Sequence, residues 1–187
     1  YNVENALAAI AVAREVGLEF DHVVDVLDSF HGAHRRFEWV GTGHGIIVYD
    51  DYAHHPTEIR KALQAARAFG RRVVAIFQPQ RYSRTQLLMD EFGHSFQDAD
   101  LVVITDIYAP PPEQPLPGVS AERLAVLVGE DIGQKRAIYI ADKDQIPDTL
   151  LPLLQDNDLV ITMGAGDIWR VAEALVQRLQ ERDVEGL

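Results

Sequence analysis

The sequence has no cysteine among its 187 residues, which excludes disulfide bonds and thiolate metal sites. It also has no apolar run of the length that crosses a membrane, and it does not open with a signal-peptide pattern. The missing cysteines are compatible with a reducing compartment. We therefore expect a cytoplasmic protein that does not act at a membrane.

Positive charge is scarce, because 17 lysines and arginines face 29 acidic residues and leave a formal net charge of −12. Nucleic acids and anionic membranes both require broad positive potential, so we expect small-molecule partners and no nucleic acid. Solubility is the plain explanation for the acidic balance. Against this background, the close pairs Arg35/Arg36 and Arg81/Arg84 are candidate local anion sites.

The apolar fraction of 47% and the charged fraction of 25% are typical of a globular protein with a sizeable core. The length predicts one domain, or one domain plus a fragment. The chain opens at Tyr1 and enters a helical pattern within a few residues. We interpret it as part of something longer.

One stretch, residues 46–60, stands out. Residues 46–49 predict a short buried strand, and Pro56 suits the first turn of a helix that ends near Gly70. That helix carries apolar residues at helical spacing: Ile59, Leu63, Ala66 and Phe69. The turn between strand and helix holds two carboxylates, a phenol and two imidazoles, at Asp50, Asp51, Tyr52, His54 and His55. In open α/β sheets, such turns lie on the edge where ligands bind.

The rest of the chain predicts two helices followed by alternating strands and helices. The first helix covers residues 5–16, and Asp21 is predicted to cap the second, which ends near Gly32. Further strands are expected at 73–77, 101–105, 137–140 and 159–163, and helices at about 85–97, from 120, at 146–154 with a break near Pro152, and at 168–178. This pattern predicts an α/β fold with a doubly wound, mostly parallel, Rossmann-like sheet, helices on both faces and a short helical segment before it.

Parallel strands share a direction, so the turns that follow them gather at one edge of the sheet. Four such turns are polar or glycine-rich: 50–55, 78–84, 106–108 and 164–167. Together they predict a pocket for a polar, anionic ligand.

Each turn has a second interpretation. The turn Gly164-Ala165-Gly166 either offers N–H groups to an anion or only lets a helix pack closely, and Asp167 suits an N-cap. Arg81 and Arg84 either face one carboxylate or are solvated. His54 and His55 lack the spacing of zinc ligands, so we expect no metal site; a bond to backbone or carboxylate is favoured for them, with pocket contact second.

Several blocks together resemble the Mur ligases, which build the peptide of the bacterial cell wall. The stretch from Asp50 to Ile59 is similar to the family signature. The blocks 2–9, 35–37, 78–85 and 164–167 are similar to the branch that adds L-alanine. The resemblance covers essentially the whole chain.

The resemblance implies an ATP-dependent ligase of peptidoglycan synthesis, an enzyme that joins L-alanine to UDP-N-acetylmuramate through an acyl phosphate. Residues 1–36 would be the tail of the central ATP-binding domain, and 37–187 the C-terminal Rossmann-like domain. It implies nucleotide contacts at Asn2, Asn5, Arg36 and Asp51. It implies substrate contacts at Tyr52, His54, His55, Gln80, Arg81, Arg84, Gly164, Ala165 and Gly166, with Gln80 standing where the family usually has histidine.

The sequence has no Gly-x-x-x-x-Gly-Lys-Ser/Thr phosphate loop. We therefore expect no catalytic residue here, with the phosphate loop and the Mg²⁺ ligands lying upstream, and we predict that the chain alone is inactive and binds ATP weakly. Two alternatives stay open: a recycling ligase of the same family that attaches a preformed peptide, and a stand-alone nucleotide-binding regulatory module.

Overall fold

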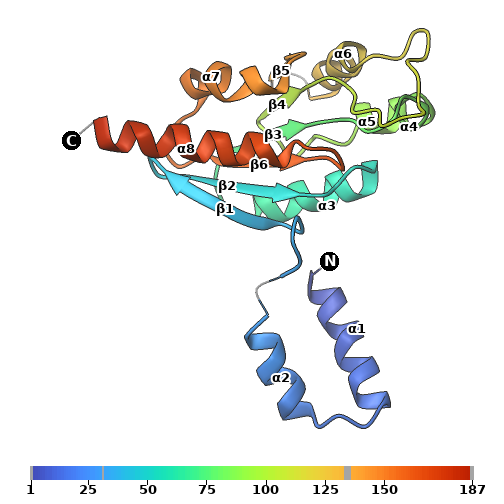
Figure 1. The fold of residues 1–187 in the computed structure, drawn as a ribbon, viewed down its shortest axis with the longest axis vertical. Helices are drawn as coiled ribbons and strands as arrows, with labels where there is room; N and C mark the ends of the chain where they lie inside the picture. The colour runs from blue at the N-terminus through green and yellow to red at the C-terminus, as the bar shows by residue number, and fades with distance from the viewer. Residues whose placement is uncertain (1, 31, 133–135, 186–187) are drawn as a thin grey trace. The chain divides into compact units, whose positions relative to one another are not determined.

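Residues 2–30, 32–132 and 136–185 are described by the computed structural model. They fall into two units, Tyr1–His34 and Arg35–Leu187 (Figure 1). Arg35 and Arg36 thus group with the second unit.

The first unit is a helix pair, as predicted. Helix α1 spans Asn2–Glu15 and helix α2 spans Phe20–Asp28. Gly17, at φ 85°, ends the first helix, because glycine adopts the left-handed conformation without a steric cost. The prediction that Asp21 caps α2 is wrong. Glu19 precedes the helix and Asp21 lies in its first turn, where a negative charge still suits the helix dipole.

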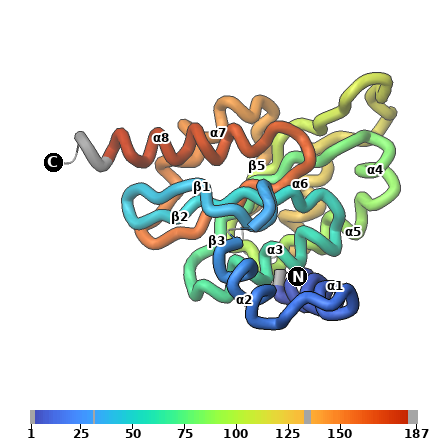
Figure 2. The backbone as a smooth tube through the Cα atoms, turned by 60° about the horizontal axis from the view of Figure 1, so that its bottom comes forward, coloured from blue at the N-terminus to red at the C-terminus, as the bar shows by residue number. Residues whose placement is uncertain are grey.

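The described residues of the second unit form a six-stranded sheet in the order β1-β2-β6-β3-β4-β5 (Figure 1), and Figure 2 traces the course of the same backbone. The pair β1–β2 is antiparallel, and all other pairs are parallel. The strands are β1 (Glu38–Gly43), β2 (Ile46–Asp51), β3 (Val73–Phe77), β4 (Leu101–Ile104), β5 (Arg136–Tyr139) and β6 (Leu159–Met163).

Helices cover both faces of this sheet, so the predicted doubly wound α/β fold is confirmed. One face packs against α3 (Pro56–Arg67), α4 (Tyr82–Leu87), α5 (Met89–Gly93) and α6 (Ala121–Asp131). The other packs against α7 (Ile146–Leu150), with the short 3₁₀ helices η1 (Lys143–Gln145) and η2 (Leu151–Leu153) on either side of it, and α8 (Trp169–Glu185). The early end of α7 near Pro152 is as predicted.

Two helical predictions need correction. The single helix expected at 85–97 is two short helices that meet at Leu88, whose φ of −112° and ψ of 18° lie outside the α region. Phe69, expected on the inner face of α3, lies beyond the end of that helix and is 47% exposed. It stacks there on Phe37, with ring centroids 6.1 Å apart.

The core follows from the alternation of side chains along each strand. In β3, Val73, Ala75 and Phe77 face α3, whereas Val74 and Ile76 face α8. Both sets are fully buried, as is typical of a parallel strand covered on both sides. Burying one large apolar side chain of this kind stabilises the fold by about 1.5–3 kcal/mol.

The carboxyl ends of the five parallel strands form a row across the sheet. In the pairing register, Asp51 lies beside Met163, Met163 beside Phe77, Phe77 beside Ile104, and Ile104 beside Tyr139. The turns that follow these residues therefore start from one edge, as predicted. Within the described residues, no helix is both long enough and apolar enough to cross a membrane.

Candidate functional site

Backbone hydrogen bonds join the predicted turns at the carboxyl edge. The N–H of Gly164 donates to the carbonyl of Asp51 (3.3 Å), and the N–H of Gln78 donates to the carbonyl of Met163 (3.0 Å). The N–H of Arg81 donates to the carbonyl of Tyr108 (2.9 Å). All four turns thus meet along one edge.

Asp50 and Asp51 were predicted to lie in the turn. They are instead the last two residues of the strand β2. Both are 2% exposed. The carboxylate of Asp51 accepts the N–H groups of Ala53 (2.7 Å) and Phe37 (2.8 Å), which ties the 35–37 segment to the strand end. Asp50 accepts the hydroxyl of Thr162 (2.6 Å) on the neighbouring strand.

Arg35 and Arg36 have different environments, so the pair does not form one anion site. Arg35 is buried, and its Nε donates to Asp50 (2.8 Å). Arg36 is exposed, and its guanidinium lies 5.8 Å from the centre of the Tyr52 ring. Arg36, a predicted nucleotide contact, therefore touches Tyr52, a predicted substrate contact.

The two histidines bond to nearby groups, the interpretation favoured from the sequence. Nδ1 of His54 lies 2.9 Å from the carbonyl of Tyr52 and 3.5 Å from the carboxylate of Glu58. Nδ1 of His55 accepts the N–H of Thr57 (3.4 Å), and Glu58 accepts the N–H of His55 (3.1 Å). His55 and Glu58 therefore cap α3 reciprocally.

The turn 78–84 holds its own arginines. Nη1 of Arg84 donates to Oε1 of Gln80 (2.9 Å), so the Gln80 side chain orients this guanidinium. Nε of Arg81 lies 3.9 Å from Glu113, in the proline-rich loop. The N–H of Ser83 donates to this carboxylate (2.8 Å) and, with the charges of both arginines, lowers the pKa of Glu113. Arg81 thus lies beside a carboxylate of the chain itself, whereas Arg84 bonds to Gln80.

The turn 164–166 packs tightly. Gly164 has a φ of 150°, and a Cβ on Gly166 would lie 2.3 Å from Oε1 of Gln78 and 2.7 Å from Cγ of Tyr108. The carbonyls of both glycines accept hydrogen bonds from Arg35. These contacts support the close-packing interpretation of the glycines, and Ala165 lies between them.

Asp167 was expected to cap the last helix, but α8 starts two residues later, at Trp169. Its carboxylate instead accepts Nε2 of Gln78 (3.3 Å) and lies 3.5 Å from Nζ of Lys143. The side chain therefore links the β3 and β6 turns to the segment after β5.

Beside these turns lies a cavity of about 300 Å³. Lys143 projects from one wall, and its pKa is raised chiefly by a hydrogen bond to Asp144 and also by the charge of Asp167. Asp106, which also lines the cavity, accepts a hydrogen bond from Tyr139. Oε1 of Gln78 is buried without a partner among the described residues. The lining residues are Gln78, Thr105, Asp106, Ile107, Tyr108, Ala109, Ala141, Asp142, Lys143 and Asp167.

Sequence reasoning missed Glu113, Lys143 and Tyr139 as parts of this edge. Tyr139 ends a strand and Lys143 follows it, so the rule that strand ends converge could have found both. Glu113 lies 30 residues from Ser83, its partner, and nothing local signals that contact.

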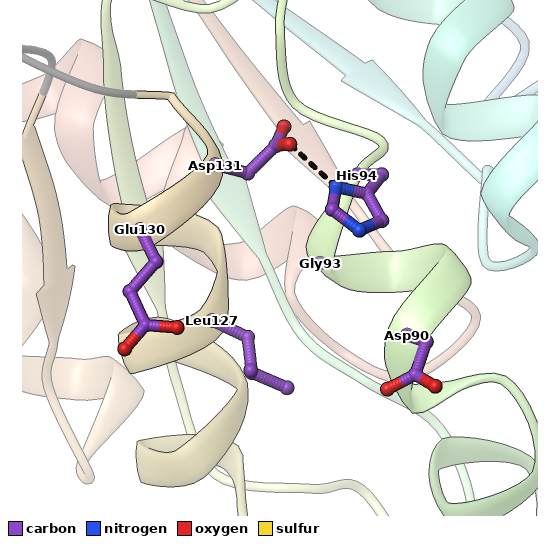
Figure 3. A pocket seen from close by; sticks show the side chains of 6 residues that line it. All are labelled: Asp90, Gly93, His94, Leu127, Glu130 and Asp131. Atoms are coloured by element: carbon purple, nitrogen blue, oxygen red, sulfur yellow. Dashed lines mark hydrogen bonds and ion pairs between the residues drawn. The ribbon is translucent and has the colours of Figure 1, made fainter.

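A second cavity, of about 390 Å³, lies between α5 and α6 and is shown in Figure 3. His94 points toward Asp131 across it, with Leu127 and Glu130 on the same helix as Asp131. The C-terminal ends of these helices return the chain to the amino ends of β4 and β5. This cavity contains none of the predicted site residues.

The described residues include no group of three or more His, Asp or Glu side chains placed to hold a metal ion. The carboxylates at the carboxyl edge bond instead to backbone N–H groups, Thr162, Tyr139 and arginines. This part of the chain therefore does not fit a resident Mg²⁺.

Two predicted nucleotide contacts lie in the first unit. Asn5 is exposed on α1. The backbone of Asn2 belongs to the same helix, but its side chain lies outside the described part of the structure.

A doubly wound domain with polar turns gathered at its carboxyl edge belongs to the class that binds nucleotides and small polar ligands. A sequence model described as "Mur ligase, glutamate ligase domain" matches residues 35–166, and the chain belongs to this family. The Mur ligase resemblance found in the sequence is thereby confirmed.

Among curated relatives, the chain is 55% identical to UDP-N-acetylmuramate–L-alanine ligase of Symbiobacterium thermophilum, over 98% of this chain and 38% of the relative. It is 52% identical to the enzyme of the same name from Trichlorobacter lovleyi, over 96% and 39%. The chain thus spans about two fifths of these relatives.

Two solved structures of similar fold are also of ligases. The UDP-N-acetylmuramate-alanine ligase of Thermotoga maritima superposes with a TM-score of 0.78 at 30% identity, covering 97% of this chain and 38% of that one. A murein peptide ligase from Psychrobacter arcticus gives a TM-score of 0.67 at 27% identity, covering 95% and 36%.

Proposed function

We propose that the chain is the C-terminal part of an ATP-dependent amide ligase that joins L-alanine to UDP-N-acetylmuramate in peptidoglycan synthesis. The single observation that carries this proposal is the meeting of Asp51, Arg81 and Gly164 at one edge of the sheet. Residues assigned to nucleotide and to amino acid lie there on directly bonded turns. The names of relatives with 55% and 52% identity support the choice of substrates.

The reaction has two steps. The terminal phosphoryl group of ATP moves to the carboxylate of UDP-N-acetylmuramate, which releases ADP. The amine of L-alanine then attacks the acyl carbon, an amide forms, and phosphate leaves with the C–O bonding pair. Such chemistry depends on holding the amine against the acyl carbon and on neutralising charge on the phosphoryl group.

The second unit would serve the amino acid and the adenosine side of the nucleotide. In this assignment Arg81 and Arg84, both in the turn 78–84 at the carboxyl edge, bind the L-alanine carboxylate. Arg81 already lies beside a carboxylate, with its Nε 3.9 Å from Glu113. A charge-assisted contact of this kind contributes about 1.5–3 kcal/mol. Tyr52, His54, His55, Gln80 and the turn Gly164-Ala165-Gly166 would line the same region.

Arg36 and Asp51 would contact the nucleotide's sugar and phosphates. The carboxylate of Asp51 accepts two N–H groups through different oxygens. A carboxylate has about four acceptor sites in all, which suits a contact to ribose hydroxyls. Asn2 and Asn5 would serve the adenine, because an amide side chain both donates and accepts hydrogen bonds.

The phosphate loop and the Mg²⁺ ligands are assigned to the rest of the protein. Bound Mg²⁺ would neutralise charge on the phosphates of ATP there. We assign the first unit to the end of the central ATP-binding domain. Several of its apolar side chains, such as Leu7 (60% exposed) and Val12 (64%), are uncovered, as expected where further chain packs.

The test is an assay of the full-length protein with ATP, UDP-N-acetylmuramate and either L-alanine or a preformed tripeptide. We expect phosphate release and product only with L-alanine. Faster reaction with the tripeptide would establish the recycling ligase, and no reaction with either would refute both. Nucleotide binding without ligation would favour a regulatory module. The isolated 187-residue chain is the control and is expected to form no product.

A further inference from the structure

The Arg35 side chain joins segments of the carboxyl edge that are far apart in the sequence. Its Nη2 donates to the carbonyl of Gly164 (2.6 Å), its Nη1 to the carbonyl of Gly166 (2.8 Å), and its Nε to Asp50 (2.8 Å). The guanidinium therefore bridges the end of β2 and the turn after β6. It is 8% exposed, so these bonds are shielded from water.

The backbone of Arg35 is fixed as firmly as its side chain. Its carbonyl accepts the N–H of Tyr52 (2.7 Å), and its N–H donates to Glu38 (2.7 Å). Its φ of 58° is costly for a residue with a side chain, and Phe37 is also left-handed, at 51°. The surrounding bonds hold Arg36, between the two, in one place.

Both arginines face the same aromatic ring. The guanidinium carbons of Arg35 and Arg36 lie 5.1 and 5.8 Å from the centre of the Tyr52 ring. Displacing Arg35 would therefore release the ring against which Arg36 rests, together with the glycine turn.

We propose that Arg35 is a positioning residue that fixes the amino-acid side and the nucleotide side of the site relative to each other. This inference rests on the proposed function for the roles of Tyr52, Arg36 and the glycine turn. Arg35 itself touches no substrate, because its donors are directed at Asp50 and at the carbonyls of Gly164 and Gly166.

A lysine at position 35 cannot make the hydrogen bonds of Arg35. A guanidinium presents donors in a rigid plane and reaches three acceptors in different directions, whereas an ammonium is a compact charge at the end of a flexible stem. Arg35→Lys keeps the charge beside Asp50 and avoids leaving that carboxylate unpaired, so the variant is expected to fold. Arg72→Lys is the matched control, because Arg72 pairs with the buried carboxylate of Asp158 (2.7 Å) at the opposite edge.

The first experiment measures steady-state kinetics of full-length protein carrying each substitution. Arg35→Lys is expected to raise KM for both L-alanine and ATP about tenfold or more, with KM for UDP-N-acetylmuramate unchanged. A purely structural defect would lower kcat through the active fraction and leave all three KM values alone. Arg72→Lys is expected to change none of them. Equal KM values for L-alanine and ATP in the two variants would overturn the proposal.

The second experiment does not depend on ligase activity. Amide hydrogen exchange of the same proteins is expected to show about tenfold faster exchange in 164–167 for Arg35→Lys, with β3 unaffected. If Arg35→Lys does not fold, Thr162→Val removes the bond that orients Asp50 and should loosen the same turn to a smaller degree. Unchanged exchange there would contradict the positioning role. If the wild-type protein shows no ligase activity but the exchange results are as expected, the proposed function is refuted and the positioning role of Arg35 is retained.

Discussion

Gly166 lies so close to Gln78 that a methyl group on its α-carbon would sit 2.3 Å from Oε1 of that amide. The contact leaves no room for a side chain, since Cγ of Tyr108 closes the other side at 2.7 Å. Gln78 is 5% exposed and is tied to Asp167, so it cannot swing away. The backbone of Gly166, the amide of Gln78 and the side chain of Tyr108 are thus in direct contact beside the cavity at the carboxyl edge.

Gly166→Ala is therefore expected to displace the turn 164–167 and to lower kcat/KM of the full-length ligase about 100-fold, the effect of misplacing reacting groups by about 1 Å. Gly129→Ala is the control. Gly129 lies in helix α6 with its nearest neighbour at 3.6 Å, so the alanine should stabilise the fold by about 0.5–1 kcal/mol. Steady-state kinetics give kcat/KM, and urea denaturation gives the free energy of unfolding, for both variants. A fully active Gly166→Ala protein would show that the turn accommodates a side chain without displacement.

His55→Ala removes the acceptor for the N–H of Thr57 at the start of α3. Loss of an N-cap typically costs about 1 kcal/mol, and we expect that decrease in the free energy of unfolding. His55→Asn retains a strong capping side chain and should restore stability. Guanidinium denaturation of the three proteins is the measurement. Equal stability of the alanine and asparagine variants would argue against capping by His55.

Burial raises the pKa of Asp158, although Arg72 opposes the shift. A carboxyl group with a raised folded pKa contributes stability below its unfolded pKa of about 3.9, and that contribution is lost as the pH rises through the folded pKa. Asp158→Asn should therefore gain stability relative to wild type as the pH increases from about 4 to 7. Urea denaturation at several pH values tests the sign, and a difference that moves the other way would contradict it.

Arg72→Met tests the same pair from the other side. It leaves the buried Asp158 carboxylate without its cation and should cost about 3–5 kcal/mol at pH 7. Combining it with Asp158→Asn should recover most of this loss. The comparison requires only denaturation curves, and a double variant as unstable as Arg72→Met would show that packing by the arginine stem dominates.

A hydrogen bond to Asp106 raises the pKa of Tyr139 to about 12. Because the neutral phenol is favoured in the fold, its contribution to stability is present below the unfolded pKa near 10 and is lost as the pH rises through about 12. Burial also raises the pKa of Tyr49, so an absorbance titration should show one fewer late-ionising tyrosine in Tyr139→Phe than in the wild type. Loss of an ordinary transition near pH 10 in that variant would refute the assignment.

Much of the fold was predictable because its signals are local. The strand β3, the Ser120 cap of α6 and the break at Pro152 each depend on a few neighbouring residues. The convergence of the turns followed from strand direction alone. The division between α4 and α5 was not predictable, because an apolar residue at helical spacing gives no sign that Leu88 leaves the α region.

The site was predictable by residue type but not by contact. The sequence predicts Arg35 as half of a candidate anion site, but its partners lie 15, 129 and 131 residues away. The aspartate expected to cap α8 binds Lys143 and Gln78 instead, which only the assembled sheet brings near. Polar networks of this kind depend on tertiary placement, and spacing along the chain does not encode it.

Because the strand ends are aligned, the packing of the core determines where the turns at the carboxyl edge lie. A slip of β6 by one residue would carry its glycines about 3.3 Å along the sheet and would turn Val160 and Ile161 toward the wrong layers. The alternation of buried apolar side chains prevents such a slip, and it thereby fixes the positions of the turns that follow the strands. Substitutions that shift the register of these buried strands are then expected to move the turns at the edge, even where no altered atom lies in a turn.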